Sequence, residues 1–146
     1  MASKKLKGIT IEIDGNTTAL SDSLKDVNKN LYSVQSELKQ VDNLLKFDPG
    51  NAELAAQKQE LLSDAIEQTT EKLRTLRTAK EQADAKLASG DMSQKQYREL
   101  EREIIAAENS LKQLNGTSQT YNTTTNQLKK NVVDLSSAMS ALDKVA

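Results

Sequence analysis

The sequence predicts an all-α protein whose long amphipathic helices form coiled-coil or helical-hairpin packing, preceded by one short N-terminal β-strand. Apolar residues recur with alternating spacings of four and three over most of the chain. Only 3% of the 146 residues are aromatic and 28% are charged, so narrow aliphatic seams must replace a thick core. One Pro and five Gly also suit long uninterrupted helices, because both residues disfavour helix interiors.

Residues 1–16 are predicted to form a strand and a turn. Ile9, Ile11 and Ile13 alternate with polar residues, which is the period-two pattern of a half-buried strand. The following Asp14-Gly15-Asn16 predicts a turn, because Gly tolerates positive φ. No second strand is apparent, so this strand needs a partner chain or a helix to cover its edge. The alternative is a partly ordered tail.

A first helix is expected over residues 18–47, with an N-cap from Asn16, Thr17 or Thr18. Leu at the a positions and mostly Val at the d positions disfavour a parallel coiled-coil dimer. This pattern predicts a homo-oligomer, trimer or higher. The heptad seam consists of Leu20, Leu24, Val27, Leu31, Val34, Leu38, Val41 and Leu45.

The helix should break at Phe47-Asp48-Pro49-Gly50-Asn51, because the residue before Pro is pushed out of the α region. Either Asp48 or Asn51 is expected to cap a second helix over residues 51–88. A connection this short favours an antiparallel hairpin with Phe47 as an apolar plug under the turn, and an extended arrangement is the alternative. The seam is diluted by polar residues: it comprises Ala55, Gln59, Leu62, Ile66, Thr69, Leu73, Leu76, Lys80, Ala83 and Leu87.

A third helix is expected over residues 93–114. Gly90 suits the left-handed position after a helix end. Ser93 and Gln96 match a capping box, and Met92 with Tyr97 matches a hydrophobic staple. Residues 115–146 are predicted to be a joint rich in Ser, Thr and Asn, followed by the start of a further helix. The helical region of residues 17–114 and this last segment are predicted as separate units, and the seam still running at Ala146 suggests a continuation.

The sequence offers no catalytic, cofactor-binding or metal-binding residues. Without His or Cys it lacks the commonest general base, the thiol nucleophile and most transition-metal ligands. Glu101 and Glu103 form a carboxylate pair, but charged residues at helical spacing usually belong to a solvated face. The net charge of −1 and the absence of a basic tract predict no specific nucleic-acid binding, and no segment is apolar enough to span a membrane. We therefore expect no enzyme and no small-molecule substrate.

Several segments together resemble the start of tail tape measure proteins of long-tailed, non-contractile phages and prophages of Gram-positive bacteria. They are KGITIEIDGNTT at 7–18, LKDVN at 24–28, LKQVDNLLKFDPGN at 38–51 and GDMS at 90–93. The resemblance covers roughly residues 5–115 and is specific as a combined pattern. Members of this family are typically several times longer, so the chain looks like an N-terminal fragment or a truncated prophage product.

The resemblance implies a rod-like structural and assembly component of the virion tail. Such a protein sets tail length by its own length and occupies the lumen of the tail tube before DNA ejection. Tail tube protein and tail assembly chaperones are the implied partners, and the host bacterial cytoplasm is the implied location during assembly. The alternative from the residues alone is a stand-alone helical adaptor that binds partner helices through its coiled-coil seams.

Overall fold

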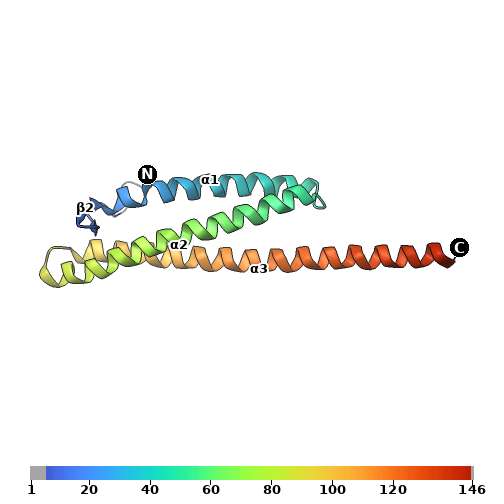
Figure 1. Ribbon diagram of the computed structural model, residues 1–146. Coiled ribbons are helices and arrows are strands. Elements are labelled where there is room, and N and C mark those ends of the chain that lie inside the picture. The colour runs from blue at the N-terminus through green and yellow to red at the C-terminus, as the bar shows by residue number, and fades with distance from the viewer. Residues whose placement is uncertain (1–5, 146) are drawn as a thin grey trace.

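The computed structural model describes the backbone of residues 6–145 and the side chains of residues 6–121. It consists of a β-hairpin followed by three long helices, so the predicted all-α class is confirmed (Figure 1). The strands are β1 (Thr10–Ile13) and β2 (Asn16–Ala19). The helices are α1 (Leu20–Phe47), α2 (Ala52–Ser89) and α3 (Gln94–Val145).

The helices reverse direction at each turn, and α2 lies between the other two. Most contacts between helices join α2 to α1 or to α3. Figure 1 shows the resulting elongated body, with α1 and α3 running in the same direction on either side of α2. The end of α3 projects beyond the α1–α2 turn. Its 52 residues correspond to a length of about 78 Å at 1.5 Å per residue.

The hairpin arrangement of α1 and α2 is therefore the one the structure adopts. Asn51 is the cap of α2, since its side-chain oxygen accepts a hydrogen bond from the backbone N–H of Leu54 at 3.0 Å. The Asn51 amide also donates to the Asp48 carboxylate at 3.1 Å. The prediction for Phe47 was wrong: its side chain is 90% exposed, because it lies beyond the last buried seam position of α1.

The joint between α2 and α3 confirms the predicted capping signals. Gly90 has φ +83° at the C-cap of α2. Ser93 and Gln96 form a reciprocal capping box, in which the Gln96 N–H donates to Ser93 Oγ and the Ser93 N–H donates to Gln96 Oε1, both at 3.1 Å. Met92 is buried, and Tyr97 packs against the same hydrophobic cluster.

The expectation of a single N-terminal strand was wrong, because residues 16–19 form a second strand. Asp14 (φ 52°) and Gly15 (φ 80°) build the two-residue turn that joins the antiparallel strands. Two successive positive φ angles are typical of a type I′ turn, whose twist matches that of the hairpin. Thr17 and Thr18 therefore lie in β2, and the N-cap of α1 is Ala19, with no capping side chain.

The expected end of the third helix at residue 114 was also wrong, because α3 continues to Val145. A single Gly in a helix costs about 1 kcal/mol relative to Ala, and Ser, Thr and Asn cost less. Packing offsets this cost, since Leu111, Leu114, Ser118 and Tyr121 keep the heptad register and are half-buried. Whether the predicted segments act as separate units stays a prediction.

The main hydrophobic core lies where the β-hairpin meets the three helices. Its largest fully buried side chains come from the N-terminal region and from all three helices: Ile9 and Ile11 of the N-terminal region, Leu20 and Leu24 of α1, Leu76 of α2, and Leu100 of α3. Six of the eight predicted seam residues of α1 are buried, and the other two are partly buried. In α2, Ala65 and Ala79 are buried outside the predicted seam, because a helix flanked on two sides needs a wider apolar face.

Candidate interaction surfaces

No group of three or more carboxylates that could hold a metal ion is present among the described residues. Glu101 and Glu103, the carboxylate pair noted in the sequence, are two residues apart on α3 and so point in different directions. Glu101 lies near Lys80 of α2, whose positive charge it complements. Within the described part of the chain no helix is long and apolar enough to cross a bilayer.

The outer edge of β1 is covered by side chains of α2. The Gln82 amide pairs with both backbone groups of Glu12: Glu12 N–H donates to Gln82 Oε1 at 2.7 Å, and Gln82 Nε2 donates to the Glu12 carbonyl at 2.9 Å. Lys86 Nζ donates to the carbonyl and hydroxyl oxygens of Thr10 at 2.9 and 2.8 Å. Two side chains of a helix thus replace the missing third strand. Period-two and heptad patterns carry no signal for such contacts, so sequence analysis missed them.

A polar cluster joins α2 and α3 near their connection. The Tyr97 hydroxyl donates to Asp84 Oδ1 at 2.5 Å, and Lys80 Nζ lies 5.9 Å from the centre of the Tyr97 ring. The hydrogen bond to Asp84 raises the pKa of Tyr97, with desolvation as the second cause. The pKa of Lys80 is raised first by the charge of the Tyr97 phenolate and then by Asp84. Lys80, one of the polar residues that dilute the predicted seam of α2, is only half-buried.

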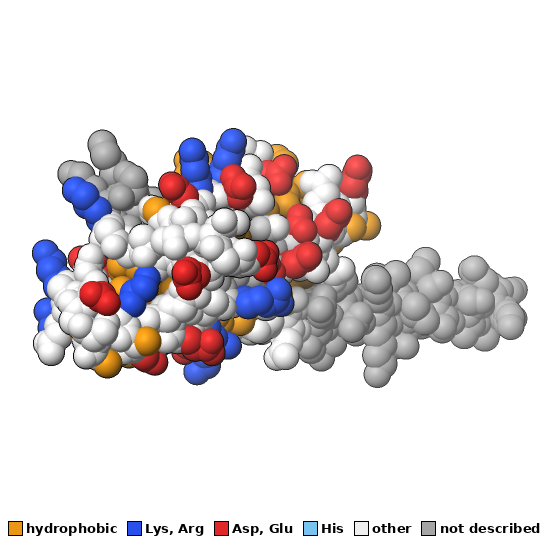
Figure 2. Space-filling view, turned by 60° about the vertical axis from the view of Figure 1, so that its left-hand side comes forward, with side chains coloured by type: hydrophobic (Ala, Val, Ile, Leu, Met, Phe, Trp, Pro, Cys, Tyr) orange, Lys and Arg blue, Asp and Glu red, His pale blue; other side chains and the backbone are white. Residues whose placement is uncertain are grey.

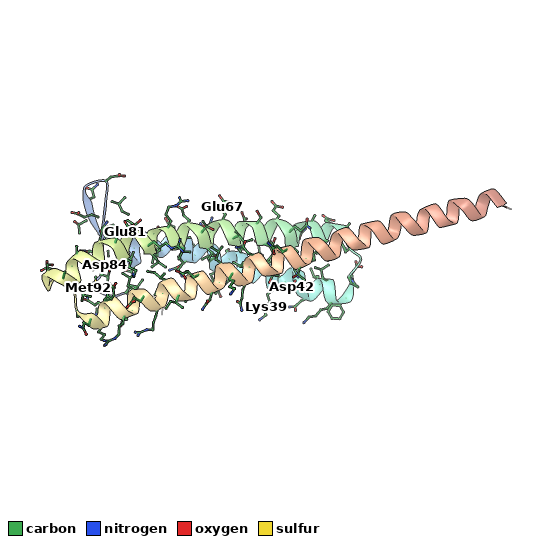
Figure 3. All side chains as sticks on the ribbon, turned by 90° about the horizontal axis from the view of Figure 1, so that it is seen from below. Lys39, Asp42, Glu67, Glu81, Asp84 and Met92 are labelled. Carbon is green, nitrogen blue, oxygen red and sulfur yellow. The ribbon has the colours of Figure 1, made fainter. Side chains whose placement is uncertain are left out.

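Lys58 of α2 connects all three helices at the opposite end of the body. Its ammonium group forms a 2.7 Å ion pair with Asp42 of α1. The same group lies 4.8 Å from the centre of the Tyr121 ring of α3. Figure 3 labels Asp42 near the α1–α2 turn and Asp84 near the α2–α3 joint, which shows how far apart these two polar clusters lie.

A groove of about 540 Å³ runs between α1 and α3, with α2 as its floor. Its charged lining consists of Lys72 alone, and several of the other side chains are small. The groove exists because α1 and α3 make few contacts with each other across α2. The lining residues are Asn28, Leu31, Tyr32, Gln35, Thr69, Lys72, Ala106, Ala107, Ser110, Gln113, Leu114 and Thr117.

Exposed large apolar side chains are few among the described residues and are scattered. Phe47 and Leu44 lie near the α1–α2 turn, Tyr32 on α1, Ile105 on α3 and Ile13 on the β-hairpin. Figure 2 shows one face of the molecule, where acidic and basic side chains are interspersed and hydrophobic ones form only small separate patches. This face has no large area of a single charge.

Comparison with curated proteins finds a similarity to the probable tape measure protein of Lactococcus phage SK1, with 32% identity over 106 residues. The match covers 73% of this chain but only 10% of that protein, so the chain spans about a tenth of the length of its relative. No protein-family model matches the chain, and no solved structure matches it. The similarity supports a relationship to phage tape measure proteins, while the finer assignment to the N-terminal region of one phage type stays a prediction.

Proposed function

We propose that the chain is a structural, non-enzymatic component of a phage tail, and that it is an N-terminal part of a tape measure protein. In this role it occupies the lumen of the tail tube before DNA ejection and contributes to setting tail length. During assembly it is present in the host cytoplasm, and its partners are the tail tube protein and the tail assembly chaperones. The observation that carries the proposal is the 32% identity to a probable tape measure protein.

The geometry of the helices suits a ruler. The rise of an α-helix is fixed by backbone hydrogen bonds at 1.5 Å per residue, so helix length follows residue number. In the folded-back body, however, α1 and α2 lie beside α3 and add little to the overall length (Figure 1). If the body persists in the tube, α3 sets the length that this segment contributes.

Two deletions of equal size test this proposal in the phage or prophage that encodes the chain. The first removes residues 118–145 from α3, and the second removes 14 residues from each side of the α1–α2 turn. Electron microscopy of tails should show shortening of about 42 Å for the first deletion and no change for the second. Equal shortening for both would mean that the helices are extended in the tube. Unchanged length for both would refute the ruler function.

The predicted trimer or larger oligomer is not tested by the structure and remains a proposal for the assembled tail. The α1 seam on which it rested is buried by α2 within one chain. Any association of copies must therefore use another surface.

A further inference from the structure

The packing of α3 against the rest of the body changes along its length. Over residues 94–107 the helix buries three apolar side chains in the hydrophobic core: Leu100, Ile104 and Ala107. Over residues 108–121, where the described side chains end, no α3 residue is buried. The large apolar heptad residues of this second stretch are only half-buried: Leu111, Leu114 and Tyr121. Because apolar burial is the dominant stabilising contribution, α3 is held firmly over the first stretch and weakly over the second.

The first turns of α2, which lie beside the end of this second stretch, show the same change. The contact between Lys58 and Tyr121 places them at this level. No side chain is buried between residues 52 and 61 of α2, whereas buried residues recur from Leu62 to Ala83. Figure 1 shows α2 inclining away from α3 as it approaches the α1–α2 turn. The two helices are therefore less tightly packed at this end.

Two grooves flank the weakly held stretch of α3. The first is the groove of about 540 Å³ between α1 and α3, which is bordered by Leu114. The second has about 570 Å³ and is bordered by Leu111 and by Leu73 and Arg77 of α2. The two grooves share no lining residue, so they lie on opposite sides of the α2–α3 contact. Water can reach this contact from both sides, and only a narrow apolar seam remains between them.

Lys58 holds α3 to the rest of the body at the far end of the weakly held stretch. Its ammonium group lies 4.8 Å from the centre of the Tyr121 ring. The 2.7 Å ion pair with Asp42 of α1 fixes the position of this group. The Lys58 side chain is only 18% exposed, so its charge is partly withdrawn from water, which strengthens its attraction to the ring.

Gly116 provides the point at which α3 can bend. It is exposed, and a Cβ at this position would meet nothing within 4 Å, so packing does not require a Gly here. A Gly within a helix weakens it relative to Ala, and the neighbouring Asn115, Thr117 and Ser118 are also poor helix formers. This locally weak helix coincides with the weakly held stretch of α3.

We propose that α3 is a two-position strap, with a hinge at Gly116 and a latch formed by Lys58 and Tyr121. In the closed position, which the structure shows, residues 117–121 lie along α2. In the open position α3 bends at Gly116 and Tyr121 leaves Lys58, while residues 94–107 stay packed in the core. The strap is a property of a single chain and does not depend on the proposed tail function.

Distances between spin labels on introduced cysteines test the latch, because the chain has no native Cys. Labels at the exposed positions Gln57 and Thr120 should give a closed distance below about 25 Å and a second, longer one. Lys58→Gln should raise the ratio of open to closed molecules about fivefold, because the cation leaves the ring. Arg74→Gln, which removes an ion pair within α2 alone, should not change this ratio. A single short distance in both the wild type and Lys58→Gln would overturn the proposal.

A matched pair of glycine substitutions tests the hinge. Gly116→Ala strengthens the helix without a clash and should lower the ratio of open to closed molecules about fivefold. Gly50→Ala, in the α1–α2 turn and equally free of close neighbours, should leave the ratio unchanged. Labels at the exposed positions Thr78 and Arg102, beside the firmly held stretch, should keep one short distance in every variant. Equal ratios in the two glycine variants, or a second distance between Thr78 and Arg102, would overturn the hinge, because the helices would then separate without bending at Gly116.

Discussion

Replacing Gln82 with Ala should release one edge of the β-hairpin while leaving the helices intact. In the hairpin the odd-numbered residues of β1 pair with β2, and the Leu20 N–H to Ile9 carbonyl bond of 2.9 Å continues this pattern. The backbone groups of Glu12 therefore point to the other edge, where Gln82 binds both of them at 2.7 and 2.9 Å. Water can replace these bonds because the site is exposed, so we expect a loss of about 1 kcal/mol.

Hydrogen exchange of single amides measures this loss. A change of 1 kcal/mol corresponds to a factor of about five, so the Glu12 amide should exchange at least about five times faster in Gln82→Ala. The Ile11 amide should change much less, because Ile11 pairs with Thr18 of β2. Gln57→Ala, an exposed substitution of the same kind on α2, serves as the control. Unchanged exchange at Glu12 would refute the idea that Gln82 covers the strand edge.

Three further predictions concern the core, the N-terminal loop and the polar cluster. Leu76→Ala removes a fully buried side chain and should lower the free energy of unfolding by about 3 kcal/mol, whereas Phe47→Ala, at an exposed position, should change it by less than about 0.5 kcal/mol in urea denaturation. Gly8→Ala should lower the free energy of unfolding by about 1 kcal/mol in the same assay, because φ is +78° and the new Cβ would lie 2.9 Å from Gln96 Nε2. An unchanged denaturation midpoint would contradict this prediction. Tyr97 should titrate above its ordinary pKa of 10.0 in an absorbance titration, and Asp84→Asn should lower that pKa. Because the folded-state pKa is the higher one, the stabilising contribution of Tyr97 should be present below pH 10 and disappear as the pH rises through the folded value.

The helices could be predicted from the sequence because their signals are local and repeated. The heptad of α1 marks its buried face, and the capping box at Ser93 marks where α3 begins, since both depend on residues within one or two turns of each other. The turn at Pro49 and Gly50 was likewise predictable. These features can be predicted without knowing which segments pack against them.

The predictions were wrong where packing between segments that are distant in the sequence determines the secondary structure. The sequence of β2, Asn-Thr-Thr-Ala, has no apolar alternation, and it forms a strand because Asp14-Gly15 turns it onto β1. The Asp-Gly turn flanked by extended residues was the signal that could have predicted the hairpin. In α3, the poor helix formers after Gly116 remain helical in one continuous element with the turns that pack on α2.

The interaction surfaces were not predictable for a related reason. Gln82 and Lys86 appear in the sequence as ordinary solvent-facing residues of a helix, yet they bind strand residues that lie 70 and 76 positions away. The groove arises because α1 and α3 both pack mainly against α2. This packing involves Ala65 and Ala79, which widen the apolar face of α2 without altering the heptad pattern.

The folded-back arrangement of α1 and α2 is the central claim, and one distance measures it most directly. The Lys58–Asp42 ion pair aligns the two helices, which places the exposed residues Ser36 and Asp64 at the same level. Spin labels on cysteines at these two positions, in chains diluted with unlabelled protein, report the distance within one molecule. Neighbouring helix axes lie 8–10 Å apart, so with the label lengths added we predict a separation below about 20 Å. A separation of about 40 Å, which 28 residues of continuous helix would span, would contradict the account.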